Sequence, residues 1–139
     1  MYNYESWCLM TRRQAREEAF ILIFEKEFND SPLSEILDLA VEVRSITPDD
    51  YIKDTFFGVY DKLSEIDKII SDNTVGWNIS RLSKTALAVL RLSIYEILYK
   101  DDIPNAVSIN EAVEILKKYA TADDASYVNG VLSSVIKKV

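Results

Sequence analysis

Histidine is absent from this chain of 139 residues, and Cys8 is its only cysteine. A serine or cysteine nucleophile would lack its usual imidazole base, and a zinc site would lack its usual nitrogen and sulfur ligands. No disulfide can form within the chain, so a reducing, cytoplasmic setting is the simplest expectation. We therefore predict no catalytic residue, no metal site and no cofactor.

Glycine and proline are also scarce, with three residues of each. Hairpin turns depend on these residues, so their scarcity and a hydrophobic content of 48% favour helices over a sheet. No apolar run approaches the roughly 20 residues needed to cross a bilayer. We predict an all-α protein without a membrane partner, comprising an N-terminal extension over residues 1–10 and a single domain over residues 11–139.

The negative charge of the chain is concentrated in its middle third. The net charge of −7 opposes the approach of a nucleic acid. Residues 27–72, however, hold 12 acids and 4 bases, whereas the remaining residues hold 11 acids and 12 bases. The acidic segment is either a solvated face or a surface for a basic partner, and the rest of the chain is close to neutral.

Residues that can cap a helix precede each segment with a helical pattern. They predict seven helix starts, at Thr11, Ser31, Thr47, Ser64, Ser83, Ser108 and Thr121. The most apolar of these segments follows Ser83, and a helix that is apolar on most sides should be central. Asn129-Gly130 is ordinarily a turn signal, but it interrupts a helical pattern that we interpret as one helix. A glycine there is tolerated best if another backbone packs closely against it.

Three basic side chains lie at the start of the first predicted helix. Helical spacing brings Arg12 and Arg13 close to Arg16. Cations at a helix N-terminus oppose the helix dipole, at about a few tenths of a kcal/mol each, so the cluster invites a functional explanation. The alternative is a solvated helix end whose arginines pair with Glu17 and Glu18.

Three separated blocks of the sequence together resemble the NusB family. They are T-R-R-Q-A-R-E at Thr11–Glu17, W-N-I-S-R-L through L-S-I-Y-E at Trp77–Glu96, and Ile103–Leu132, which contains I-N-E-A-V and Y-V-N-G-V-L. The resemblance implies about seven helices in two packed bundles. It also implies a bacterial transcription antitermination factor that binds boxA RNA of nascent ribosomal RNA with the small-subunit ribosomal protein NusE, within the transcription elongation complex.

The resemblance also implies roles for particular residues. Arg12, Arg13 and Arg16 would neutralise RNA phosphates, while Tyr127 would stack on a base and Asn129 would bond a base edge. Tyr127 as a core aromatic and Asn129 as a helix-packing residue form the alternative.

Three further residues of the family pattern are expected to be structural. Glu111 would complete a cap with Ser108, Asn110 would bond a neighbouring helix, and Gly130 would allow close packing. Two positions depart from the pattern, since Gln14 and Ser126 stand where relatives often carry a basic residue, which would reduce RNA affinity.

Two other functions stay open from the sequence. One is a protein-interaction module without significant RNA binding. The other is the helical domain of an RNA methyltransferase, which would be followed by a cofactor-binding domain; we expect no such domain here. Whether the protein is a monomer or a homodimer is also open.

Overall fold

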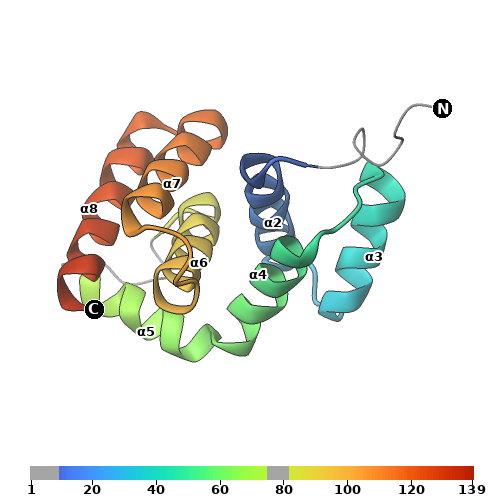
Figure 1. Ribbon diagram of the computed structural model, residues 1–139, viewed down its shortest axis with the longest axis horizontal. Coiled ribbons are helices and arrows are strands. Elements are labelled where there is room, and N and C mark those ends of the chain that lie inside the picture. Colours follow the sequence, from blue (N-terminus) through green and yellow to red (C-terminus); the bar gives the residue numbers. More distant parts are fainter. Residues whose placement is uncertain (1–9, 75–81) are drawn as a thin grey trace.

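The computed structural model describes residues 10–74 and 82–139. The predicted N-terminal extension up to residue 9, and the beginning of the block that starts at Trp77, lie outside these ranges. Within them the chain forms seven helices and no strand, which confirms the predicted all-α class. Numbered as in Figure 1, the helices are α2 (Arg12–Lys26), α3 (Leu33–Arg44), α4 (Asp50–Asp61), α5 (Leu63–Asn73), α6 (Lys84–Tyr99), α7 (Asn105–Tyr119) and α8 (Ala122–Lys138).

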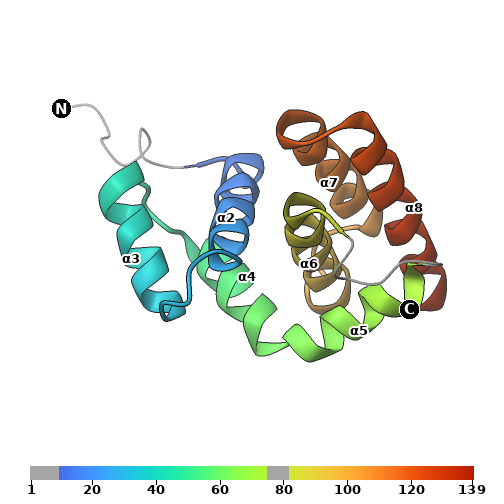
Figure 2. The same ribbon diagram turned by 180° about the vertical axis from the view of Figure 1, so that it is seen from behind.

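The helices pack as two bundles, as predicted. Helices α2, α3 and α4 form an N-terminal bundle, and α5 to α8 form a C-terminal bundle, with α5 leading from one to the other (Figure 1). Helix α6 packs on α2 and α4 as well as on α5, α7 and α8, so it belongs to both interfaces. Every residue from Ala86 to Glu96 of this helix is buried, which confirms its predicted central position. The view from behind shows the same division (Figure 2).

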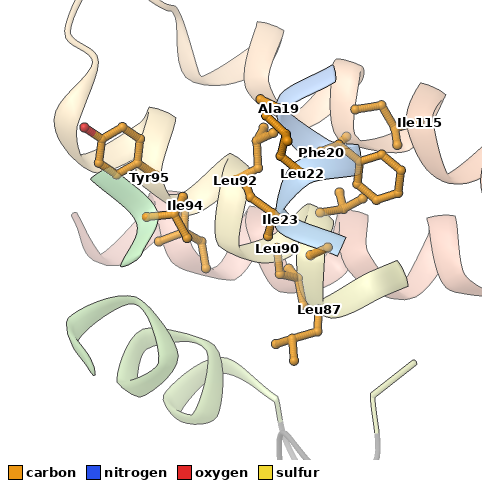
Figure 3. Close-up of a cluster of buried hydrophobic side chains, with 14 of the residues drawn as sticks. Ala19, Phe20, Leu22, Ile23, Leu87, Leu90, Leu92, Ile94, Tyr95 and Ile115 are labelled. Atoms are coloured by element: carbon orange, nitrogen blue, oxygen red, sulfur yellow. The ribbon is translucent and has the colours of Figure 1, made fainter. Parts of the chain in front are cut away.

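A continuous apolar core joins the two bundles. Ala19, Phe20, Leu22 and Ile23 of α2 lie with Leu87, Leu90 and Leu92 of α6, as Figure 3 shows. Burying a leucine or isoleucine side chain contributes about 1.5–3 kcal/mol of stability, so these contacts fix the position of α2 against α6. The arginines at the start of α2 therefore occupy a set position relative to the C-terminal bundle.

Three predicted caps are confirmed. The side-chain oxygens of Thr11, Ser83 and Thr121 accept hydrogen bonds from the backbone amides of Gln14, Ala86 and Asp124 at 3.0–3.1 Å. The Gln14 side chain also accepts the Thr11 amide at 2.8 Å, which completes a capping box. Gln14, one of the two predicted departures from the family pattern, thus stabilises the helix that presents the arginines.

The other predicted starts were displaced or lack a hydroxyl cap. Pro32 and Pro104 occupy the positions before α3 and α7 without a side-chain cap, and α5 follows Lys62 directly. Asp49, two residues after Thr47, caps α4 by accepting the Ile52 amide at 2.8 Å. The backbone at Pro32 and Pro104 is extended, and each helix begins at the residue that follows its proline. Helix α3 therefore begins after the predicted start at Ser31, and α7 begins before the predicted start at Ser108.

Helix α8 continues through Asn129 and Gly130, which confirms the single helix predicted there. The expected close packing at Gly130 is wrong, because the residue is exposed and a Cβ placed on it would meet no atom within 4 Å. The close approach occurs instead at Gly58 of α4, where a Cβ would overlap the Tyr95 ring of α6. No helix in the described ranges is long and apolar enough to cross a membrane.

Candidate functional site

A buried ion pair ties the first turn of α2 to the central helix. Arg16 Nε donates to Glu96 Oε2 at 2.7 Å, and the Arg16 and Glu96 side chains are 3% and 0% exposed. The Ser108 hydroxyl donates to Glu96 Oε1 at 2.8 Å, and the Tyr51 hydroxyl donates to the same carboxylate. A buried charge is tolerated only when it is paired and hydrogen-bonded, and here α2, α4 and α7 all supply partners to α6.

This network corrects two expectations. The buried Arg16 guanidinium faces Glu96 and does not face solvent, so it is not placed to neutralise a phosphate. Burial acts to lower the pKa of Arg16, but the hydrogen bond and charge of Glu96 outweigh it and the pKa is raised. Ser108 lies inside α7 with its hydroxyl turned to Glu96, so it does not cap that helix.

Arg13 and Glu111 form a second ion pair on the surface beside this network. Arg13 Nε donates to Glu111 Oε1 at 3.0 Å, and Arg13 Nη2 donates to Glu111 Oε2 at 2.8 Å. Arg16 Nη1 lies 3.3 Å from the same Oε1. The Arg13 hydrogen bond lowers the pKa of Glu111, with the charges of both arginines contributing. The expected cap with Ser108 is therefore wrong, because the Glu111 carboxylate is drawn to two arginines of the other bundle.

Arg12 has a different environment from either of its neighbours. Its guanidinium lies 4.6 Å from the centre of the Tyr51 ring, a cation–π contact, and the residue is exposed. No carboxylate pairs with it among the residues that the structure describes. Of the three predicted arginines, Arg12 and Arg13 thus reach the surface and Arg16 does not.

The acids next to these arginines have other partners, so the simple pairing along the first helix is not observed. Glu17 accepts a hydrogen bond from Lys118 Nζ at 2.6 Å and another from the Tyr119 hydroxyl. Glu18 accepts from Arg44 Nε at 3.1 Å. Glu17 and Glu111 therefore both bridge α2 to α7, and both line a cavity of about 240 Å³.

A groove of about 590 Å³ runs between α7 and α8 and opens beside Arg13. Its polar lining is mixed in charge and consists of Arg13, Asn110, Glu111, Glu114, Lys117, Ser126 and Asn129. Asn110 is exposed on its rim and makes no hydrogen bond to a neighbouring helix within the described ranges, which contradicts the expected structural role. The tertiary structure thus brings together a guanidinium and two side-chain amides that the sequence separates by about a hundred residues.

Tyr127 is not part of this groove. Its half-buried ring packs against the hydrophobic core, and burial raises the pKa of its hydroxyl. Lys117 and Lys118, at the end of α7, lie near Arg13 and were not predicted as site residues. The run K-K-Y at the end of an amphipathic segment was the available signal, but a basic last turn is also an ordinary way to complement a helix dipole.

A third polar cluster lies away from this surface and is structural. Arg91 of α6 donates from Nε and Nη2 to the two carboxylate oxygens of Asp67, both at 3.0 Å, and it also pairs with Glu27. Two acids of the middle segment are therefore occupied inside the protein. Among the described residues no group of three or more acidic or cysteine side chains is placed to hold a metal ion.

Two helical bundles, with Arg12 and Arg13 exposed at their junction, define a small all-α protein. The family model described as NusB family matches residues 13–137. The transcription antitermination protein NusB of Ruminiclostridium cellulolyticum is 48% identical over 130 residues, which cover 92% of this chain and 90% of that protein. The chain therefore belongs to the NusB family.

Solved structures agree with this assignment. The NusB of T. maritima superposes with a TM-score of 0.82 at 36% identity, covering 93% of this chain and 92% of that one. A crystal structure of the antitermination factors NusB and NusE in complex with dsRNA contains a chain that superposes with a TM-score of 0.83 at 27% identity. That match covers 94% of this chain and 100% of the other.

Proposed function

We propose that this protein is an RNA-binding transcription antitermination factor that acts with NusE on boxA-type RNA. The observation that carries the proposal is membership of the NusB family over nearly the whole described chain, with relatives named as antitermination proteins. The relatives' name denotes a transcription factor and not an enzyme, in agreement with the absence of catalysis expected from the sequence. A related chain has been crystallised with NusE and RNA, which supports both partners.

The geometry supports a smaller phosphate-binding set than the sequence suggested. Arg12 and Arg13 are exposed at the start of α2 and would each neutralise a phosphate. With about two such contacts, log affinity for single-stranded RNA should fall with log salt at a slope of about −1.4. Binding by this protein alone is therefore weak, and a basic ribosomal protein would supply further positive charge.

The groove beside Arg13 is the proposed place for a base. Asn110 and Asn129 present side-chain amides to it, and an amide can donate and accept at a base edge in the same plane. Asn110 joins the proposed RNA site on this ground. Tyr127 remains a candidate for base stacking through the exposed part of its half-buried ring.

The proposed setting follows from the partners. A protein that acts with NusE on nascent RNA would work in the cytoplasm, in contact with the transcription elongation complex. The protein would enter that complex as a monomer or a homodimer. Size-exclusion chromatography with light scattering, with and without NusE and RNA, decides between these two states.

The decisive test is fluorescence anisotropy with a labelled boxA-like RNA and a scrambled RNA, each with and without NusE, at two salt concentrations. Tighter, sequence-selective binding in the presence of NusE supports the proposal. Equal and weak binding to both RNAs under every condition would favour a protein-interaction module instead.

A further inference from the structure

The Arg13 guanidinium is already occupied by an acidic side chain from the other bundle. Both of the N–H groups that face Glu111 donate to it, at 3.0 and 2.8 Å. The paired N–H groups of a guanidinium that bind a carboxylate in this way can bind a phosphate in the same way. Arg13 can therefore bind RNA through these groups only after it leaves Glu111.

Arg13 is free to swing outward, whereas Glu111 is not. The Arg13 side chain is 71% exposed, and the Glu111 side chain is 12% exposed. A largely buried carboxylate without a cationic partner is costly, and this cost would normally keep Arg13 paired with Glu111. Arg16 reduces that cost, because its Nη1 lies 3.3 Å from the Glu111 oxygen that also accepts from Arg13 Nε.

The arrangement around Arg16 keeps this second partner in place. Arg16 is held by Glu96 through two contacts, of 2.7 and 3.3 Å, and these do not involve Arg13. When Arg13 leaves, Glu111 thus keeps one cationic partner and Arg16 keeps its own. The neighbouring Arg12 has no acidic competitor within the described ranges and rests on the Tyr51 ring.

We propose that Glu111 restrains RNA binding by competing with phosphate for the Arg13 guanidinium, so that RNA engages this surface by exchange of ion-pair partners. The proposal rests on the proposed RNA-binding function and assigns a regulatory residue to the same site. Arg12 makes contact first, and Arg13 is recruited only by an RNA that places a phosphate within its reach. An RNA that binds too weakly to displace Glu111 from Arg13 therefore gains no contact with Arg13.

The experiment compares four variants by anisotropy with a boxA-like RNA in the presence of NusE. Glu111→Gln removes the charge and keeps the shape of the side chain. Arg13→Gln and the double variant test whether the effect passes through Arg13. Asp72→Asn is the matched control, because Asp72 is an exposed acid of α5 that pairs with Lys68 at 2.9 Å and lies on no part of the proposed site.

We expect Glu111→Gln to bind the RNA about threefold to tenfold more tightly than the natural protein, because the competing ion pair is gone. Arg13→Gln should bind more weakly, and the double variant should match Arg13→Gln. Asp72→Asn should give a clearly smaller gain than Glu111→Gln, since it removes the same charge without releasing Arg13.

Two results would overturn the proposal while leaving RNA binding intact. One is a gain in Glu111→Gln no larger than that in Asp72→Asn, which would reveal a general effect of charge. The other is a gain that persists in the Arg13→Gln background. If neither the natural protein nor Glu111→Gln binds the RNA with NusE present, the proposed RNA function itself fails, and the exchange with it.

A second variant keeps the test informative if Glu111→Gln unfolds. Glu111→Asp retains the charge but shortens the side chain by one methylene, which breaks the two-point grip on Arg13. It should bind RNA more tightly than the natural protein although the net charge is unchanged. Affinity equal to that of the natural protein would overturn the exchange.

Discussion

Arg16 and Glu96, 80 residues apart in the sequence, form a buried ion pair in which Arg16 Nε donates to Glu96 Oε2 at 2.7 Å. This pair fixes the start of α2 against the central helix, while Arg12 and Arg13 remain on the surface. One of three arginines with similar sequence positions is thus structural. The first prediction follows from that difference.

Replacing Arg16 should affect stability before it affects binding. Arg16→Met leaves the Glu96 carboxylate buried without its cation, and breaking a buried pair in this way costs about 3–5 kcal/mol. Urea unfolding followed by circular dichroism measures the loss. The double variant Arg16→Met/Glu96→Met removes both charges and should recover part of it. A change below about 1 kcal/mol in Arg16→Met would contradict the structural role.

The two exposed arginines should carry the salt dependence of RNA binding. Arg12→Gln/Arg13→Gln should weaken binding and make the slope of log affinity against log salt shallower by about 1.4, because two phosphate contacts are lost. Lys68→Gln is the matched control, since Lys68 is a 75% exposed cation of α5, on which no part of the proposed site lies. An unchanged slope in the double variant would remove these arginines from the RNA surface.

Two glycines should respond in opposite directions to the same substitution. Gly130→Ala should raise the free energy of unfolding by up to about 1 kcal/mol, because the position is helical and a Cβ meets open space. Gly58→Ala should lower it by about 1–3 kcal/mol, because the Cβ overlaps the buried Tyr95 ring. Thermal unfolding of the two variants checks both. Equal effects would show that packing around α4 and α8 differs from that described.

Acid should weaken the contacts between the bundles. The pKa of Glu111 is lowered from 4.5, mainly by the Arg13 hydrogen bond, and that of Glu17 is lowered because its bonds from Lys118 and Tyr119 outweigh burial. A carboxyl whose pKa is lower in the folded state stabilises the fold above pH 4.5. That stability is lost as pH falls from about 4.5 through the folded value.

Urea unfolding at pH 6 and pH 3.5 measures this loss. The natural protein should lose more stability between the two pH values than Glu111→Gln, which has one fewer group to protonate. Identical losses in the two proteins would show that Glu111 contributes nothing to the acid sensitivity.

Much of the fold could be read from local sequence. The caps at Thr11, Ser83 and Thr121 and the continuous helix through Asn129 follow from neighbouring residues, because capping and helical periodicity act over three or four positions. The apolar pattern after Ser83 was sufficient to predict a central helix. The family was recognisable because its blocks keep their order along the chain.

The roles of Arg16, Glu111, Ser108 and Gly130 were decided only by the tertiary structure. Spacing along α2 shows that Arg13 and Arg16 lie close together, but whether either is buried depends on α6 and α7, which are folded against α2 from 80 or more residues away. Ser108 and Glu111 have the spacing of a cap, yet α7 begins at Asn105 and both side chains bind charged groups of other helices. Local pattern determines the helices of this protein, and packing between the bundles determines which of its charges face the solvent.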